Sequence, residues 1–441
     1  MPYQDDREAF LDQVCAQIRA TPMHMDIREE IGGHFDELVE VKLAEGCSEE
    51  EASIWAKAQL GSPTELGRQL HSIHKPKLNW SILIAVFGLV TIGLVGLWFA
   101  DQYYSTYENS NLKEVNFFGR QSIGLLIGVI AMVILYFVPY TWLRSYAWHI
   151  YVLISVVWIL TRIEHLGVNG YPGFINLPFI NFPIHIGSLS VYLYLKSISG
   201  MYSRFQMNRS NTVYFYLNMI SVSVFPVLFL VNSLASLAIY LIAIICINYW
   251  YFRSKWIVIL GSIMALGGSS LYMYMNERLA NKFLAIFNVR KYAESEGYTV
   301  FRYQEALRSA GWWGQGNGTD LKYLPYIHSD SMFVYIVYYF GWIVGISVCL
   351  LVLFLATHFL FTYRQVRDQF GQSLVLIISL ILIFRLVYSV LMALGLAPFI
   401  GMNFPFLNYG LSQLIIDFAG VGLMLGIYRR KDITSRLVVP M

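Results

Sequence analysis

Long apolar runs fill most of the chain beyond residue 79, and they constrain its fold more than any other feature. A helix crosses a bilayer core of about 30 Å with roughly 20 consecutive apolar residues, and several runs reach that length. Hydrophobic residues make up 56% of the chain and charged residues 13%, a balance too apolar for a soluble protein of 441 residues. The sequence therefore predicts an all-α polytopic membrane protein with about ten transmembrane helices. The runs lie near residues 80–100, 117–138, 146–160, 187–200, 213–229, 233–250, 256–275, 331–361, 373–395 and 411–428.

Charge separates the first 77 residues from the rest. Residues 1–77 carry 15 acidic and 8 basic side chains, a net charge of −7, whereas the remainder carries 13 acidic and 23 basic, a net charge of +10. We expect a small acidic helical prefix domain at 1–77 and a transmembrane domain at 78–441. The first 30 residues contain no apolar segment of a signal peptide, so none is expected. The four cysteines suggest neither a disulfide framework nor a Cys-rich metal site.

The prefix sequence predicts four helices. Gly46 ends the second, a capping box at Ser48 and Glu51 opens the third, Gly61 ends the third, and Pro63 stands at the first position of the fourth. Two interpretations stay open: a folded tether, or a docking module for a cytoplasmic partner. The first two helices are indicated by apolar residues that share one helical face, namely Phe10, Leu11, Val14 and Ile18, and then Ile27, Ile31, Phe35, Leu38 and Val39.

Basic residues on alternate short loops predict the orientation. Because cytoplasmic loops carry an excess of Lys and Arg, both termini are expected in the cytoplasm and the long loop at 276–330 outside the plasma membrane. The basic residues are Arg144, Arg204, Arg209, Arg253, Lys255, Arg364, Arg367, Arg429, Arg430 and Lys431, and the opposite loops hold Asp101, Glu108, Glu114 and Glu164.

The candidate site lies in that long loop. A glycine-rich stretch at 311–318 (GWWGQGNG) is followed by residues 324–330 (LPYIHSD), which end on Asp330 at the head of an apolar run. A charge so near lipid is costly and usually functional. The alternative is that Asp330 caps the helix that begins at Ser331. The glycines lack the preceding strand and following Lys of a nucleotide-binding loop, and no nucleic-acid partner is expected.

Two further charges interrupt apolar runs. Arg385 lies within the ninth run and Asp417 within the tenth, and a short loop joins the runs. The two residues fall near the same depth, and a lone buried charge is costly, so we predict an Arg385–Asp417 ion pair. Two roles stay open for this ion pair: it holds the two helices together, or it takes part in transport or lipid-headgroup binding.

Eight short motifs occur in an order and spacing that resemble the FtsW/RodA/SpoVE family, also called SEDS proteins. The resemblance spans nearly all of 80–430 and implies a ten-helix glycosyltransferase that polymerises lipid II at the outer face, in cell division, elongation or sporulation, with a class B penicillin-binding protein. The motifs are 118–121 (FGRQ), 169–170 (NG), 297–299 (GYT), 306–311 (ALRSAG), 314–318 (GQGNG), 324–330 (LPYIHSD), 395–398 (GLAP) and 404–412 (FPFLNYGLS).

The resemblance also implies roles for particular residues. Asp330 matches the carboxylate of the family's His-Thr-Asp motif and would be the general base, with His328 and Ser329 beside it. The leaving diphosphate requires positive charge, from basic residues of the loop or from a divalent cation, Mg or Mn. The other expected substrate-binding residues are Arg302, Arg308, Lys322, Gly314, Gly316, Pro405 and Tyr409. The turn at 404–410 is either a wall of the lipid-substrate cavity or an interfacial plug.

Several family positions depart from the pattern. Tyr338 and Tyr339 stand where the family carries an acidic pair, and residues 183–186 (PIHI) replace its Gln-Pro-Ser-Glu segment. Residues 231–236 (VNSLAS) replace its Gln-Pro-Asp-Leu-Gly-Thr. Two alternatives to catalysis therefore stay open: a non-catalytic scaffold or regulator of cell-wall synthesis, and a transporter of lipid-linked precursors. The prefix carries Glu29, Glu30, His34 and Glu37 in its second expected helix, a turn at 48–52 (SEEEA) and a step at 60–63 (LGSP). These features resemble the HAAS or permease-prefix domain, which implies signalling or partner binding without chemistry.

Overall fold

The computed structural model describes most of the chain and divides it into two compact units. The units are Met1–Leu78 with Ile427–Met441, and Asn79–Gly426. The described residues are 2–18, 24–73, 78–106, 115–163, 174–175, 183–205, 226–230, 233–252, 297–316 and 324–431, together with scattered positions between 256 and 295.

The first unit contains the four expected helices. They are α1 (Pro2–Ala16), α2 (His24–Ala44), α3 (Glu49–Leu60) and α4 (Pro63–Ile73). The capping box is confirmed, because the Ser48 side chain accepts a bond from the Glu51 N–H and the Glu51 side chain accepts one from the Ser48 N–H. Gly46 and Gly61 have positive φ angles of 88° and 80°, which explains why α2 and α3 end at glycines.

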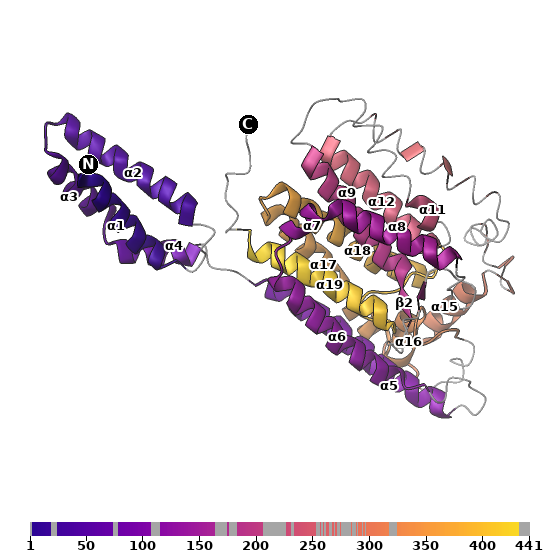
Figure 1. The fold of residues 1–441 in the computed structure, drawn as a ribbon. Coiled ribbons are helices and arrows are strands. Elements are labelled where there is room, and N and C mark those ends of the chain that lie inside the picture. Colours follow the sequence, from indigo (N-terminus) through magenta and orange to yellow (C-terminus); the bar gives the residue numbers. More distant parts are fainter. Residues whose placement is uncertain are drawn as a thin grey trace. The chain divides into compact units, whose positions relative to one another are not determined.

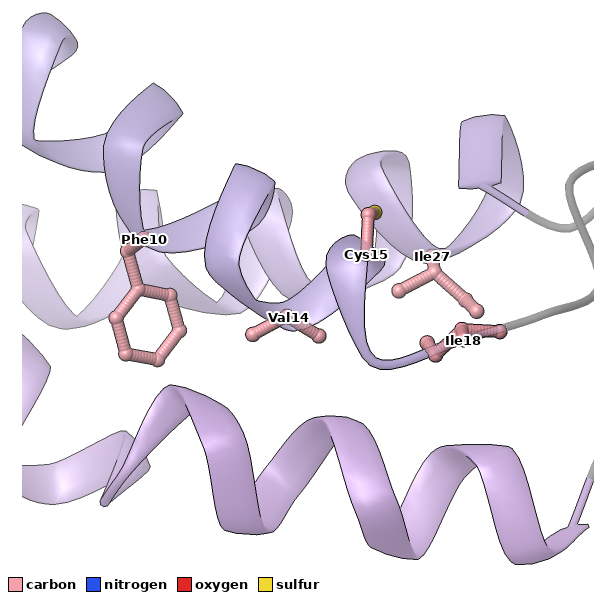
Figure 2. Packing of buried hydrophobic residues seen from close by; sticks show 5 residues of the cluster. All are labelled: Phe10, Val14, Cys15, Ile18 and Ile27. Atoms are coloured by element: carbon pink, nitrogen blue, oxygen red, sulfur yellow. The ribbon is translucent and has the colours of Figure 1, made fainter.

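Two small apolar clusters form the core of this unit. The first consists of Phe10, Val14, Cys15, Ile18 and Ile27, whose side chains lie between the helices in Figure 2. The second joins α2 to α3 through Phe35, Val39, Ala52 and Ala56. Outside the core, Asp6 pairs with Lys57 at 2.7 Å, and the hydrogen bond from Lys57 lowers the pKa of the Asp6 carboxyl.

The second unit is helical, with one short pair of strands. The strands β1 (Phe174–Ile175) and β2 (Ile184–His185) are antiparallel, with Phe174 opposite His185. The helices, labelled in Figure 1, are α5 (Trp80–Thr106), α6 (Phe117–Phe137), α7 (Thr141–Ser145), α8 (Ala147–Ile163), α9 (Ile186–Phe205), α11 (Val227–Leu230), α12 (Leu234–Phe252), α15 (Tyr298–Ser309), α16 (Met332–Phe340), α17 (Trp342–Gln365), α18 (Gln369–Ala393) and α19 (Leu411–Arg429).

Six of the helices in the described residues are long and apolar enough to cross a membrane. They are α5, α6, α12, α17, α18 and α19. The expected all-α polytopic membrane protein is therefore confirmed. Helices α8 and α9 coincide with the predicted runs at 146–160 and 187–200. The predicted runs at 213–229 and 256–275 lie largely outside the described residues, as does Asn232.

One expected element boundary is wrong, and one expected loop contains a helix. The run at 331–361 is two helices, α16 and α17, separated at Gly341, whose φ of 91° a helix does not accept. The predicted polar loop contains α15, which buries Val300, Tyr303, Ala306 and Leu307 on one side. These residues follow a helical period, so the sequence did contain the signal for α15.

Helix α18 lies at the centre of this unit. It contacts α9, α12 and α17, while α16 contacts α5, α15 and α17. Most of α18 is buried, including Arg385 and Ser389. The segment that follows α18, residues 394–410, is irregular and leads to α19. This irregular segment and the turn before α16 carry the candidate site.

Candidate functional site

The glycine-rich loop closes the break between α16 and α17. The N–H of Trp342 donates to the carbonyl of Gly311 at 3.0 Å, and the N–H of Gln315 donates to the carbonyl of Tyr338 at 2.9 Å. A helix break leaves backbone N–H and C=O groups without partners, and such groups are costly at membrane depth. The loop supplies those partners, so its described part, residues 311–316, joins the two helices.

The two predicted glycines differ in their surroundings. A Cβ at Gly314 would lie 2.2 Å from the carbonyl oxygen of Tyr339, and its φ is 84°. Gly316 also has a positive φ, 59°, but nothing lies within 4 Å of a Cβ built there. Close backbone contact therefore requires glycine at 314, whereas at 316 only the backbone angle favours it. Their expected role in substrate binding stays a prediction.

The turn that carries His328, Ser329 and Asp330 is held by its neighbours. The Ser331 hydroxyl contacts the Tyr303 hydroxyl at 2.8 Å and also donates to the carbonyl of Pro325. Within the turn, the N–H of Ser329 donates to the carbonyl of Tyr326 at 2.9 Å. Because Tyr303 belongs to α15, that helix helps to fix the turn.

Asp330 is half-buried in this turn. Across the described residues, no hydrogen bond or ion pair reaches its carboxylate. Burial raises the pKa of the Asp330 carboxyl to about 6. The capping alternative is wrong: α16 begins at Met332, its N-cap is Ser331, and no side chain caps it. Within the described residues, the carboxylate therefore has no capping role and no bonded partner.

His328 packs among aromatic rings. Its ring stacks on Phe117 with centroids 4.3 Å apart, and its Nδ1 lies 3.2 Å from the Tyr104 hydroxyl. Burial lowers the pKa of His328 to about 4, so the ring is neutral at pH 7. Within the described part of the chain, no group of three or more His, Cys, Asp and Glu side chains is arranged to hold a metal ion. These contacts fix the orientation of the ring, and the positioning role expected for it in catalysis stays a prediction.

A second loop, at 404–410, is bonded to the His328 turn. The N–H of Tyr409 donates to the carbonyl of His328 at 2.9 Å, and the Tyr409 ring meets Phe117 edge-on at 5.0 Å. Pro405 is buried in the same loop. Phe406 has a φ of 66°, a strained conformation for an aromatic residue.

Gln121 and Arg120 complete the arrangement, although sequence reasoning assigned them no role. The Gln121 side-chain amide donates to the carbonyl of Asn408 and accepts from the N–H of Gly410, both at 3.0 Å. Arg120 is exposed and lies beside the Tyr409 hydroxyl. Both residues belong to the motif at 118–121, so the sequence did signal them.

The basic residues expected to bind substrate lie in different surroundings. Arg302 pairs with Glu305 at 2.7 Å and lies over the Tyr298 ring. Arg308 is exposed and has no ion pair within the described ranges. Lys322 falls outside the described residues. Arg120 and Arg308 are thus the exposed cations that the structure places on the elements of the site.

Arg385 and Asp417 come together inside the bundle. Arg385 Nη1 lies 2.5 Å from Asp417 Oδ1, and the side chains are only 5% and 1% exposed. The same oxygen accepts from Gln413 Nε2 at 2.9 Å and from the Tyr192 hydroxyl at 3.4 Å. The predicted partners are therefore adjacent, and three donors share the buried charge.

These features define an integral membrane protein with a half-buried carboxylate where two irregular segments meet beside a broken helix. A family model described as cell cycle protein, for FtsW, RodA and SpoVE, matches residues 79–433. The chain belongs to this family.

Similar proteins are known by sequence and by structure. The probable peptidoglycan glycosyltransferase FtsW of Geobacter sp. (strain M18) is 25% identical over 365 residues, which cover 80% of this chain and 96% of the relative. The FtsW of Bacillus subtilis (strain 168) is 29% identical over 181 residues, 39% of this chain and 44% of the relative. The fold resembles a chain of a solved peptidoglycan synthase complex, with a TM-score of 0.63, 17% identity, and coverage of 80% and 98%. It also resembles Thermus thermophilus RodA, with a TM-score of 0.54, 16% identity, and coverage of 80% and 97%.

Proposed function

We propose that this protein is a peptidoglycan glycosyltransferase that polymerises lipid II at the outer face of the membrane, with Asp330 as general base. The observation that carries the proposal is the Asp330 carboxylate: half-buried, unbonded within the described residues, and held in a turn fixed by α15 and by Tyr409. A perturbed carboxyl in such a place is a candidate functional group. Relatives that align over most of the chain are named probable peptidoglycan glycosyltransferases, which supports the proposal.

The chemistry needs one base and a charge-stabilised leaving group. Asp330 accepts the proton of the acceptor sugar hydroxyl as that oxygen attacks the anomeric carbon of the lipid-linked donor. The bond between this carbon and the diphosphate breaks, and the diphosphate leaves with the electron pair. A pKa of about 6 keeps the carboxylate ionised at pH 7 and leaves it a stronger base than an ordinary aspartate.

Positive charge near the diphosphate comes from the exposed guanidinium groups. Arg120 lies beside Tyr409, whose loop is bonded to the His328 turn, and Arg308 lies in the last turn of α15. A bound divalent cation, Mg or Mn, would supply further charge to the leaving oxygen. Among the described residues, no group of three or more His, Cys, Asp and Glu side chains could hold such an ion.

The proposed orientation follows the positive-inside rule. The prefix domain and both termini lie in the cytoplasm, and the segment 276–330 lies outside with the site. The proposed partner is a class B penicillin-binding protein, and the similarity to a chain of a peptidoglycan synthase complex supports this pairing. The prefix domain then remains free for a cytoplasmic partner.

A specific observation favours a second candidate, a non-catalytic scaffold. Tyr338 and Tyr339 occupy the positions where the resemblance predicts an acidic pair, and Tyr338 is buried. The Tyr339 ring lies 4.8 Å from the Phe99 ring and 4.7 Å from Phe340. Apolar packing has thus replaced polar groups beside the site, which would suit a protein that kept the family frame without its chemistry.

Glycan polymerisation by the purified protein tests the proposal. Fluorescent lipid II and a divalent cation are supplied, with and without a class B penicillin-binding protein. Wild type is compared with Asp330→Asn, and with Glu305→Gln as a control carboxylate of the same loop, exposed and paired with Arg302. Wild type should form polymer, Asp330→Asn should lose about 10²-fold or more, and Glu305→Gln should stay within a few-fold of wild type.

Three outcomes would contradict the proposal. Equal polymerisation by Asp330→Asn removes the carboxylate from the chemistry. No polymer from a folded wild type with any partner indicates the scaffold. Movement of lipid II across vesicle membranes without polymer indicates a precursor transporter.

A further inference from the structure

Three side chains on one face of α18 bond the irregular segment that follows it. The Tyr388 hydroxyl donates to the carbonyl of Pro398 at 2.9 Å, and the Ser389 hydroxyl to the carbonyl of Met402 at 3.4 Å. Arg385 Nη2 donates to the carbonyl of Asn403 at 3.2 Å. Residues three and four apart lie on the same side of a helix, so one face of α18 provides all three donors.

These hydrogen bonds supply donors to backbone carbonyls that are not bonded within the segment itself. Residues 398–403 have no helix or strand, and backbone carbonyls without partners are costly in a membrane protein. Arg385 also has a second partner, because its other terminal nitrogen, Nη1, pairs with Asp417 of α19. Its planar guanidinium therefore links α18, α19 and the segment 398–403.

The same segment borders Asp330. Gly401 lies within it, with a φ of 65°, and a Cβ built there would be 3.9 Å from Asp330 Oδ2. Among the described residues, Tyr303 of α15 feels the charge of Asp330, and His328 lies two residues before it in the same turn. Burial raises the pKa of Tyr303 and lowers that of His328, so both are neutral at pH 7. The exclusion of water therefore governs the pKa of the Asp330 carboxyl.

We propose that Arg385, Tyr388 and Ser389 are positioning residues that hold the segment 398–403 against Asp330 as one wall of its site. None of the three is assigned to substrate; they act through the backbone that they bond. If the bonds are removed, the segment moves away and water reaches the carboxylate. The catalytic consequence rests on the proposed function, whereas the structural consequence does not.

Chemical modification of Asp330 tests the wall directly. A hydrophobic carbodiimide reacts with a protonated carboxyl, and mass spectrometry of the full-length protein in detergent gives the extent of modification at Asp330 against pH. The test variants are Tyr388→Phe, Ser389→Ala and the double variant, which remove hydroxyl donors and preserve most of the packing. The matched control is Ser347→Ala, because the Ser347 hydroxyl is exposed and, within the described residues, bonds the carbonyl of Ile343 in its own helix and no other segment.

The wild type should show a modification midpoint near pH 6. The double variant should shift it toward acid by about one pH unit, because a hydrated carboxyl is a stronger acid. The single variants should shift it less, and Ser347→Ala should not shift it. An unshifted midpoint in the two single variants overturns the inference even if the double variant fails to fold.

Polymerisation measured on the same preparations separates the two proposals. If wild type forms polymer but the variants show unshifted midpoints, the positioning role of the three residues is refuted and the proposed function stands. Shifted midpoints without polymer from any preparation leave the wall standing and refute the proposed function. Where both hold, the pH profile of polymerisation should move with the midpoint.

Discussion

Tyr409 donates its backbone N–H to the carbonyl of His328 at 2.9 Å, and this bond joins the two loops that carry the candidate site. Gln121 holds the other side of the Tyr409 loop through its side-chain amide. The chain therefore builds the surroundings of Asp330 from three segments that are far apart in sequence.

Polymerisation should increase as the pH rises through about 6. Asp330 must be ionised to act as the base, and burial raises the pKa of its carboxyl to about 6. Activity should therefore fall about tenfold for each pH unit below that value. The rate of polymer formation from saturating lipid II between pH 4.5 and 8 measures this limb. A rising limb near pH 4 would contradict the half-buried Asp330 carboxylate as the base.

The same shift predicts how stability depends on pH. The folded state favours the protonated Asp330 carboxyl. The contribution of this carboxyl to the stability of the fold is therefore full below the ordinary carboxyl pKa and is lost as the pH rises through about 6. Wild type should therefore melt below Asp330→Asn at pH 7.5 and approach it at pH 4. Thermal unfolding in detergent at the two pH values measures the difference, and a difference independent of pH would oppose the prediction.

Gly314→Ala should be much more destabilising than Gly316→Ala. Both residues have positive φ angles, which cost an alanine about 1 kcal/mol or more, but only at 314 would the Cβ collide with the Tyr339 carbonyl. Paired melting curves of the two variants isolate the collision, because the backbone penalty is common to both. Equal melting temperatures would show that the loop does not close the α16–α17 break in this way.

Arg385→Met should destabilise the bundle by about 3–5 kcal/mol, because it leaves the Asp417 carboxylate buried without its cation. Asp417→Leu should do the same to Arg385. The double variant should be less destabilised than the sum of the single variants, since no unpaired charge then remains. Full folding of both single variants, judged by monodispersity and melting temperature, would refute a mutually dependent pair.

Lys196→Met should stabilise the protein. Lys196 is 9% exposed in α9, and its contact is with the Tyr192 ring at 5.3 Å; no ion pair to it occurs within the described residues. A buried ammonium is costly to desolvate, so removal of its charge should raise the melting temperature by about 2 °C or more. Lys196→Arg keeps the charge and should give no such gain. A lower melting temperature for Lys196→Met would mean that the charge supports the fold.

Much of the helical architecture could be predicted because its causes are local. The capping box at Ser48 and the glycine ends of α2 and α3 depend on residues within one turn. The membrane helices depend on the length of their apolar runs. Arg385 and Asp417 could be paired because two charges at similar depth in neighbouring runs have few alternatives to each other.

The candidate site could be predicted only in part. The sequence indicated the His328–Asp330 turn and the Tyr409 loop, but not the bond between them, the clamp of Gln121, or the face of α18 that holds residues 398–403. The break at Gly341 was also missed, because the apolar run continues through it and the compensating groups lie in another segment.

The sequence by itself determined that this chain is a helical membrane protein with an acidic helical prefix, because periodicity, caps and apolar length act over short stretches of chain. Only the tertiary structure decided which backbone groups meet around Asp330. Most of the partners there are backbone carbonyls and N–H groups, which every residue carries, so side-chain identity alone does not specify their pairing. Their pairing follows from how the helices pack, and that packing places the carboxylate among groups that exclude water.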